Sequence, residues 1–197
     1  MSSYKEKAKM KFCQGNDVDF KLSFSDFICD CYVRLKPCSY GARIQSKILK
    51  DIGGVSVSPS LNMGDFVIND KMFVELKVSF LGQGKSYSIT HVRMWQKFNC
   101  YLFCFIDCEN DFEPEFYLID KYVMNRLSLR PMNGTKKSNS ENTNIEVRAT
   151  IKKNDPSHLL LKKENKLKGT TMEDLILFVK GNRPKTIMDK VWERMGL

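Results

Sequence analysis

The sequence predicts an α/β (α+β) fold in which a central mixed β-sheet is flanked by helices and followed by a basic C-terminal extension. Three observations support this prediction. Helix-like and strand-like patterns alternate along the chain, which is typical of layered folds. A chain of 197 residues is long enough to bury one sizeable core. A hydrophobic content of 42% is typical of a folded domain.

The first two expected elements are helices. FSDFICDCYVRL (24–35) has apolar residues at helical spacing, and Ser25 is in position to cap its start. SYGARIQSKILKDIGG (39–54) carries an isoleucine at every fourth position and ends in two glycines. That pattern predicts an amphipathic helix with a glycine stop.

The middle of the chain predicts most of the sheet. Residues 65–79 indicate a β-hairpin, because an Asn-Asp turn at 69–70 separates two apolar runs. SITHVRMWQKFNC (88–100) is interpreted as a helix, and the apolar segments 101–107 and 115–120 as strands.

The remaining sequence is more polar and more basic. We expect a short helix at 120–127 and a polar loop at 131–142. Two strands are expected at 145–151 and 157–163, and two final helices at 170–181 and 184–197. The expected division is a core with an N-terminal helical segment over 1–128 and a basic region over 129–197 that packs on this core. The last 47 residues contain 11 basic and 6 acidic side chains, a balance that favours a polyanion, so we expect the region 129–197 to contribute to DNA binding.

The sequence contains no feature typical of export or membrane insertion. No apolar run approaches the ~20 residues that span a bilayer, and the basic N-terminal stretch lacks an apolar segment behind it. Seven cysteines without a secretory context argue against a disulfide scaffold. We therefore expect a cytoplasmic protein without a membrane partner.

Two groups of cysteines allow two interpretations. They are Cys29, Cys31 and Cys38, and Cys100, Cys104 and Cys108. Neither group has the paired C-x-x-C spacing of structural zinc sites, although a zinc site stays open as an alternative. The apolar surroundings of the second group favour reduced thiols in the core.

The charge of the chain narrows the choice of partner. The net charge is +9 and the isoelectric point is near 9.2. Such a balance favours a polyanion, first nucleic acid and then an anionic membrane surface. The alternative is that the lysines only keep the chain in solution.

The hairpin segment GDFVINDKMFVELKVS (64–79) carries the acids Asp65 and Glu75 and the lysine Lys77 within its apolar runs, and a competing acid, Asp70, that its turn explains. In a strand, residues two apart share a face, so Glu75 and Lys77 lie together, and the hairpin turn can bring Asp65 close to Glu75. Charges inside strands are costly unless they are paired or bind a metal. Two carboxylates side by side would suit Mg²⁺. The alternative is a solvent-facing ion pair on an edge strand.

The pattern Asp-x(9)-Glu-x-Lys in a hairpin between helices resembles the PD-(D/E)XK nuclease superfamily, and within it the small type II restriction endonucleases. The resemblance covers roughly residues 39–120 and implies a restriction-endonuclease-like core of order αβββαβ. It implies that Asp65 and Glu75 hold Mg²⁺, with the carbonyl of Leu76 as a further ligand, and that Lys77 positions the attacking water.

Further positions follow from the same resemblance. Gly64 replaces the proline of the motif, and Gln96, with Tyr101 after it, is similar to a Gln-Tyr feature of some members. These nucleases often carry another acid on the first core helix, where this chain offers only Asp51.

Three basic residues are candidate DNA contacts. Arg93 precedes Gln96 by three residues, which would place both on one face of the expected helix 88–100, and Lys136 and Lys137 lie in the polar loop. Each of the three is equally compatible with plain solvation. The sequence contains neither G-x-x-x-x-G-K-[ST] nor G-x-G-x-x-G, so we expect no nucleotide cofactor.

These features together predict a Mg²⁺-dependent, sequence-specific DNA endonuclease that acts as a homodimer on double-stranded DNA. Two identical sites related by a two-fold axis can cut both strands of a palindromic target. Other restriction-like nucleases, such as junction resolvases and repair or defence nucleases, stay open, as does a non-catalytic DNA-binding protein with the same fold.

Overall fold

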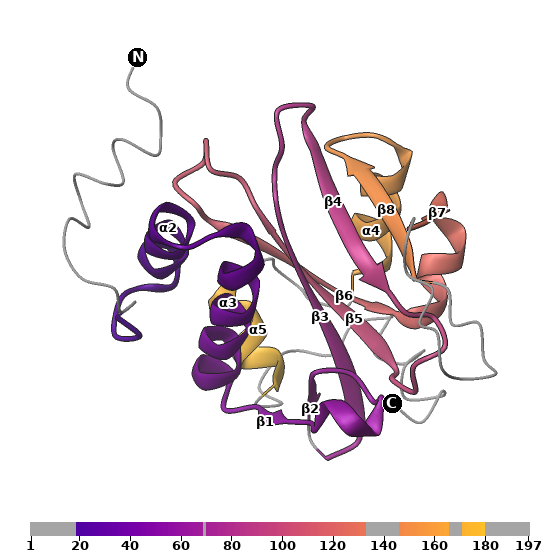
Figure 1. The fold of residues 1–197 in the computed structure, drawn as a ribbon, viewed down its shortest axis with the longest axis horizontal. Coiled ribbons are helices and arrows are strands. Elements are labelled where there is room, and N and C mark those ends of the chain that lie inside the picture. Colours follow the sequence, from indigo (N-terminus) through magenta and orange to yellow (C-terminus); the bar gives the residue numbers. More distant parts are fainter. Residues whose placement is uncertain (1–18, 69, 133–145, 166–170, 180–197) are drawn as a thin grey trace.

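The computed structural model describes residues 19–68, 70–132, 146–165 and 171–179. These residues form a mixed α+β fold in which an open mixed sheet is flanked by helices (Figure 1). In the described ranges no helix combines the length and apolar character needed to cross a bilayer.

The larger sheet has five strands in the order β1-β2-β3-β5-β6. They are β1 (Val55–Ser56), β2 (Phe66–Ile68), β3 (Met72–Phe80), β5 (Cys100–Ile106) and β6 (Pro114–Asp120). The pairing of β3 with β5 is parallel and every other pairing is antiparallel. The predicted hairpin and both predicted apolar strands are therefore confirmed.

A second, three-stranded antiparallel sheet runs in the order β4-β8-β7. Its strands are β4 (Ser86–Val92), β8 (Val147–Lys152) and β7 (Leu129–Pro131). β4 comes from the 1–128 portion of the chain, whereas β7 and β8 come from the 129–197 portion. Strands from both sides of the expected division thus share one sheet.

The helices are α2 (Phe24–Arg34), α3 (Pro37–Ile52), α4 (Pro156–Glu164) and α5 (Met172–Val179), with 3-10 helices η1 (Pro59–Leu61) and η2 (Lys121–Arg126). The predicted helices at 24–35, 39–54 and 170–181 are confirmed, and 120–127 is 3-10 rather than α-helical. The expected helix at 184–197 lies outside the described residues. The cap of α2 is Ser23, which accepts from the Asp26 N–H, and not Ser25.

The sheet separates two apolar clusters. Helices α2, α3 and α5 cover one face, where Ile44, Val74 and Leu102 are buried together. The second sheet covers the other face over a cluster that includes Tyr87, Phe103 and Ile151. Figure 1 shows this arrangement, with the three helices to the left of the larger sheet and β4, β7 and β8 to its right.

The predicted helix at 88–100 is wrong. Residues 86–92 form β4, in which Tyr87 and Ile89 are buried and Ser88 is exposed. The period of two and the β-branched residues favour a strand. The partner that completes the pairing, β8, lies far along the sequence, so the local pattern alone was ambiguous.

The predicted strand at 157–163 is also wrong, because these residues belong to helix α4. Asp155 caps the helix by accepting from the N–H groups of Ser157 and His158, and Pro156 occupies its first turn. Asp followed by Pro is a strong helix start, and it outweighs the apolar run of three leucines.

The crossover between the parallel strands β3 and β5 therefore passes through β4 and the turn after it. The hydroxyl of Ser79 holds β4 against β3 as the two strands enter different sheets: it donates to the Ser88 carbonyl at 3.0 Å and accepts from the Ser88 N–H at 2.9 Å. The helix of the expected αβββαβ order is replaced by a strand.

Candidate active site

Gly64 sets the approach of β2 to β3. Its φ is +86°, and a Cβ atom there would lie 2.6 Å from the Val74 carbonyl oxygen. Neither a proline, whose φ is fixed near −65°, nor a bulkier residue fits this position. The glycine at this position thus has a structural reason, since the chain needs glycine to place Asp65 against β3.

Asp65 is held by both its backbone and its side chain. Its N–H donates to the Val74 carbonyl at 2.8 Å, and its carbonyl accepts from the Val57 N–H at 3.0 Å. Its carboxylate accepts from the Leu76 N–H at 2.8 Å. Because the N–H and C=O of one strand residue point to the same side, the Leu76 carbonyl also faces this edge of β3.

Glu75 and Lys77 lie on the same face of β3, as the sequence predicts. The Lys77 ammonium donates to the Glu75 carboxylate at 2.6 Å. Glu75 is only 6% exposed, and the Lys77 side chain is 16% exposed. Glu75 is therefore buried and Lys77 is partly buried, so the pair differs from the solvent-facing ion pair that was the alternative.

Burial raises the pKa of the Glu75 carboxyl above its ordinary value. Lys77 lowers that pKa, the negative charge of Asp65 raises it, and Arg93 lowers it. The net effect is a raised pKa of Glu75. The carboxylates of Asp65 and Glu75 and the cations Lys77 and Arg93 therefore form one interacting group of charges. Such coupling is common at functional sites.

The β5 residues beside the pair are aromatic and buried. Tyr101 stands opposite Glu75 and Phe103 opposite Lys77 in the parallel register, and both are fully buried. Burial, and then the Glu75 charge, raise the pKa of the Tyr101 hydroxyl. An apolar floor strengthens every electrostatic interaction made above it.

Arg93 reaches the site from the end of β4 rather than from a helix. The β4–β8 register shifts between Ile89 and Val92, and His91 has a φ of +53°. A bulge of this kind redirects the side chains that follow it. The charge of Arg93 acts on Glu75 from this position.

Glu146 holds Arg93 in place, a role that no sequence pattern indicates. The Glu146 carboxylate accepts from Arg93 Nε at 2.6 Å and bonds His91 Nδ1 at 2.7 Å. Although burial opposes it, these two hydrogen bonds hold the pKa of Glu146 below its usual range. Glu146 directly precedes β8 and contacts residues more than fifty positions earlier, a pairing that only the fold reveals.

Gln96 lies in the turn between β4 and β5. The turn is tied to the hairpin region because the Lys97 N–H donates to the Asn62 carbonyl at 2.8 Å and the Asn99 N–H to the Phe73 carbonyl at 2.9 Å. Gln96 is 7% exposed, and its Oε1 is buried with no hydrogen-bond partner among the residues that the structure describes. A buried amide oxygen with no partner marks a place for a donor such as a water.

The other predicted positions lie elsewhere. Asp51 forms an ion pair with Lys47 at 2.7 Å at the end of α3. Lys136 and Lys137 lie outside the described residues. Among the described cysteines, Cys29, Cys31, Cys100 and Cys104 are buried thiols, as expected for the core. Burial raises the pKa of Cys31 to about 12.

The donors around Asp65 suit a hard cation. The side chains of Asp65 and Glu75 and the carbonyl of Leu76 are all oxygen ligands, which Mg²⁺ prefers, and it commonly takes one or two carboxylates with several waters. Over the described ranges no cluster of three or more His, Cys, Asp or Glu side chains is placed to hold a metal. Two carboxylates and a carbonyl are the set that this site offers.

No protein-family model matches the chain, and no curated protein matches it. Any functional assignment therefore rests on the residues of the site.

Proposed function

We propose that this protein is a Mg²⁺-dependent DNA endonuclease whose active site is formed by Asp65, Glu75 and Lys77. The observation that carries the proposal is the buried Glu75 carboxylate paired with the part-buried Lys77, with the Asp65 carboxylate held at the neighbouring strand by the Leu76 amide. Burying one carboxylate beside two partly buried charges is costly in free energy. A site that retains them has a use for them beyond stability.

The residues divide the chemistry among them. When bound, Mg²⁺ would supply Lewis-acid activation of a phosphate oxygen and of a water. Asp65, Glu75 and the Leu76 carbonyl would hold it. Lys77 is placed beside Glu75 to orient the attacking water and to stabilise the negative charge that develops on phosphate. Arg93, held by Glu146, adds a second cation, and Gln96 offers an acceptor for a water.

A restriction-endonuclease-like core is part of this proposal. The helical layer, the β2–β3 hairpin and the parallel β3–β5 pair support it. The strand crossover through β4 departs from the expected order, so the chain would be a divergent form of that core. We further propose a type II, sequence-specific enzyme acting in the cytoplasm as a homodimer, because one site cuts one strand.

A non-catalytic DNA-binding protein is the second candidate. The observation that favours it is the 2.6 Å contact between Lys77 and Glu75, which already neutralises the buried carboxylate without a metal. Such a protein would bind DNA with strong salt dependence and leave its phosphodiester bonds intact.

Cleavage assays with matched variants separate the two. We expect the wild-type chain to cut unmethylated phage DNA with Mg²⁺, and Asp65→Asn and Glu75→Gln each to lower the rate by at least about a hundredfold, as expected when an electrostatic partner of the transition state is lost. Asp70→Asn, in the exposed β2–β3 turn, is the control and should keep full activity. Sequencing of the ends distinguishes a fixed target from structure-directed cutting. Full activity in Asp65→Asn would reject the site.

A further inference from the structure

The outer face of the second sheet carries a single sign of charge. The register places Ser86 opposite Lys152, Ser88 opposite Thr150, and Arg130 opposite Arg148, while Tyr87, Ile89 and Ile151 face the core. We name this outer surface the β4–β8–β7 face, and its residues are Ser86, Ser88, Arg130, Arg148, Thr150 and Lys152. None of the six is acidic or aromatic.

The opposed arginines lack compensation within the described part of the chain. No carboxylate there forms an ion pair with Arg130, Arg148 or Lys152. Nearby acids have other partners, since Glu146 binds Arg93 and Asp107 binds Lys153. Like charges directly opposite in a sheet are destabilising.

Two ordinary reasons for such charges do not account for this face. Lysines often protect the edges of sheets against aggregation. Arg148 and Lys152, however, lie on β8, the central strand of the three. Charges kept for solubility are usually of mixed sign, and these are not.

We propose that the β4–β8–β7 face binds the phosphate backbone of duplex DNA. Arg148 and Lys152 are four residues apart, about 13 Å along the strand. At about 3.4 Å of axis per phosphate, that length matches about four phosphates of one DNA strand. The hydroxyls of Ser88 and Thr150 lie between the cations and are suitable phosphate donors. Without an aromatic residue to stack on bases, the contact is with the backbone and is independent of sequence.

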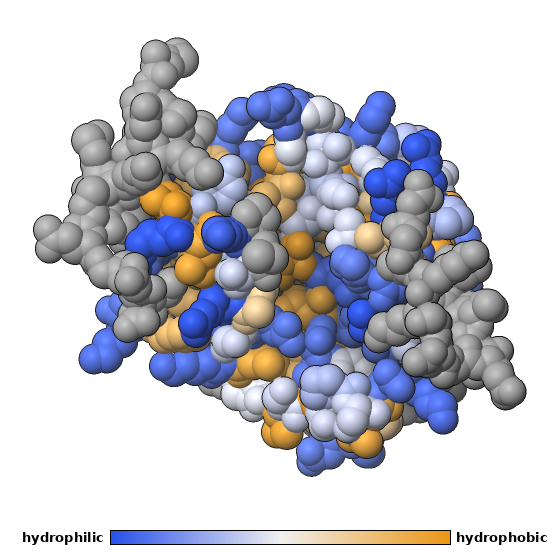
Figure 2. All heavy atoms as spheres, viewed as in Figure 1, coloured by the Kyte–Doolittle hydropathy of each residue, from blue (hydrophilic) through white to orange (hydrophobic). Residues whose placement is uncertain are grey.

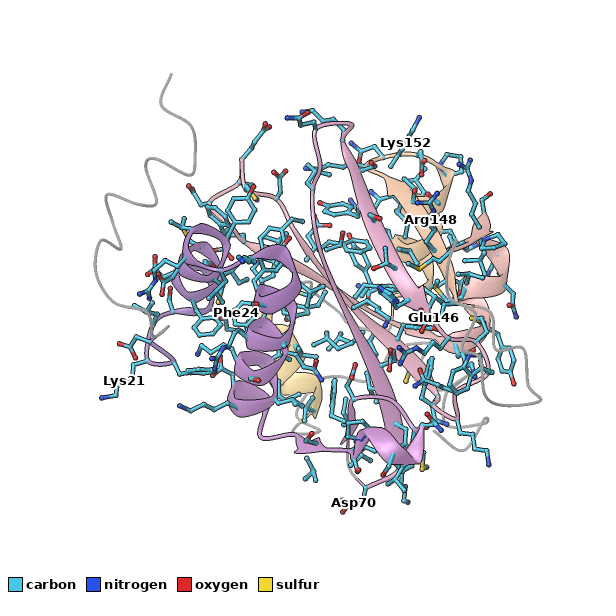
Figure 3. All side chains as sticks on the ribbon, in the orientation of Figure 1. Lys21, Phe24, Asp70, Glu146, Arg148 and Lys152 are labelled. Atoms are coloured by element: carbon cyan, nitrogen blue, oxygen red, sulfur yellow. The ribbon has the colours of Figure 1, made fainter. Side chains whose placement is uncertain are left out.

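The face leads toward the candidate active site. Figure 3 shows Lys152, Arg148 and Glu146 in a row along β8, and Glu146 holds Arg93, whose charge acts on Glu75. Figure 2 shows mainly pale and blue spheres over β4 and β8 in this view, in keeping with a polar surface. The inference rests on the proposed function, because the β4–β8–β7 face would bind duplex DNA next to the candidate active site.

The test measures binding without cleavage. The full chain is titrated with a fluorescent duplex in EDTA over a range of salt concentrations. The triple variant Arg130→Gln, Arg148→Gln, Lys152→Gln should lower the slope of log K against log salt by about 2–3, about one per phosphate contact. The control, Lys21→Gln, Lys36→Gln, Lys71→Gln, removes the same charge from exposed positions elsewhere and should leave the slope nearly unchanged.

An unchanged slope in the triple variant would overturn the proposal, as would an equal loss of slope in the control variant. The proposal would also fail if the three residues were needed for binding to vesicles of anionic lipid but not for binding to duplex DNA. Thermal unfolding of both variants shows that each is folded. The assay contains no divalent metal, so it measures DNA binding by the β4–β8–β7 face independently of cleavage. A protein that never cuts DNA could still bind it through this face, so failure of the nuclease proposal and failure of this inference are separate outcomes.

Discussion

Replacing Lys77 by Met tests whether the pair on β3 is a buried charge cluster. At 2.6 Å and an effective dielectric of about 20, two unit charges attract by about 6 kcal/mol, and the cost of desolvation opposes much of this. Removing one partner of a buried pair typically costs about 3–5 kcal/mol, because the other charge stays uncompensated. Since the Lys77 side chain is 16% exposed, we expect about 3 kcal/mol. For a chain of this length that is a fall of about 6–12 °C in Tm.

The loss should depend on pH in a defined direction. Burial already raises the pKa of Glu75 above its ordinary value of 4.5, and Lys77 opposes that rise. Without Lys77 the pKa rises further. A carboxyl whose pKa is raised on folding destabilises the protein when ionised, so the penalty is absent below pH 4.5 and grows as pH rises through the folded-state pKa.

Urea unfolding of Lys77→Met at pH 4 and pH 8 measures this difference. Adding Glu75→Gln to the variant removes the uncompensated charge and should restore most of the loss at pH 8. Lys71→Met, at an exposed turn position, is the control and should change stability by less than about 0.5 kcal/mol. A loss below about 1 kcal/mol, or one equal at both pH values, would refute the claim that the pair is buried and coupled.

Two further substitutions test how the site is built. Gly64→Ala should destabilise the fold by about 3 kcal/mol in urea unfolding, since it combines a positive φ with a clash against Val74. Gly41→Ala, on open surface within α3, should stabilise by about 0.5–1 kcal/mol, and similar effects at the two sites would contradict the close approach of β2. Glu146→Gln should cost about 2 kcal/mol at pH 7, because hydrogen bonds to a buried charge are lost. The pKa of Glu146 is below its ordinary 4.5, so its stabilisation is present above pH 4.5 and lost as pH falls through the folded-state pKa. The free energies of unfolding of the variant and the wild type should therefore converge at low pH. A difference that stays constant with pH would argue against this role of Glu146.

Local patterns predicted most of the larger sheet and its helical layer. The isoleucines of α3 recur with the helical period, and β5 and β6 are short apolar runs buried on both faces, so both signals are visible in the sequence. They predicted one strand of the second sheet, since the strand expected at 145–151 is confirmed as β8, but they did not predict β4, β7 or the sheet as a whole. β4 is stabilised by β8, and α4 by a cap at Asp155, so a window around 88–100 or 157–163 contains only part of the decisive interactions.

Local patterns likewise predicted one part of the candidate site and not the other. Glu75 and Lys77 share a face by the two-residue period alone, and the hairpin places Asp65 beside them. The anchoring of Arg93 by Glu146 could not be predicted, because it depends on the β4 bulge and on a strand from the far side of the sequence. The requirement for glycine at position 64 likewise follows only from the distance to Val74.

The crossover through β4 has a consequence for synthesis on the ribosome. β4 ends at Val92, but β8, the strand it pairs with, ends at Lys152. At about 5–20 residues per second, the roughly 60 residues between these ends take about 3–12 s to translate. For that interval the nascent chain carries a strand edge without its partner, and its apolar cluster lacks the cover of Ala149 and Ile151 from β8. The yield of folded protein is therefore decided partly by elongation rate and chaperone capture, before the stability of the finished fold has any effect.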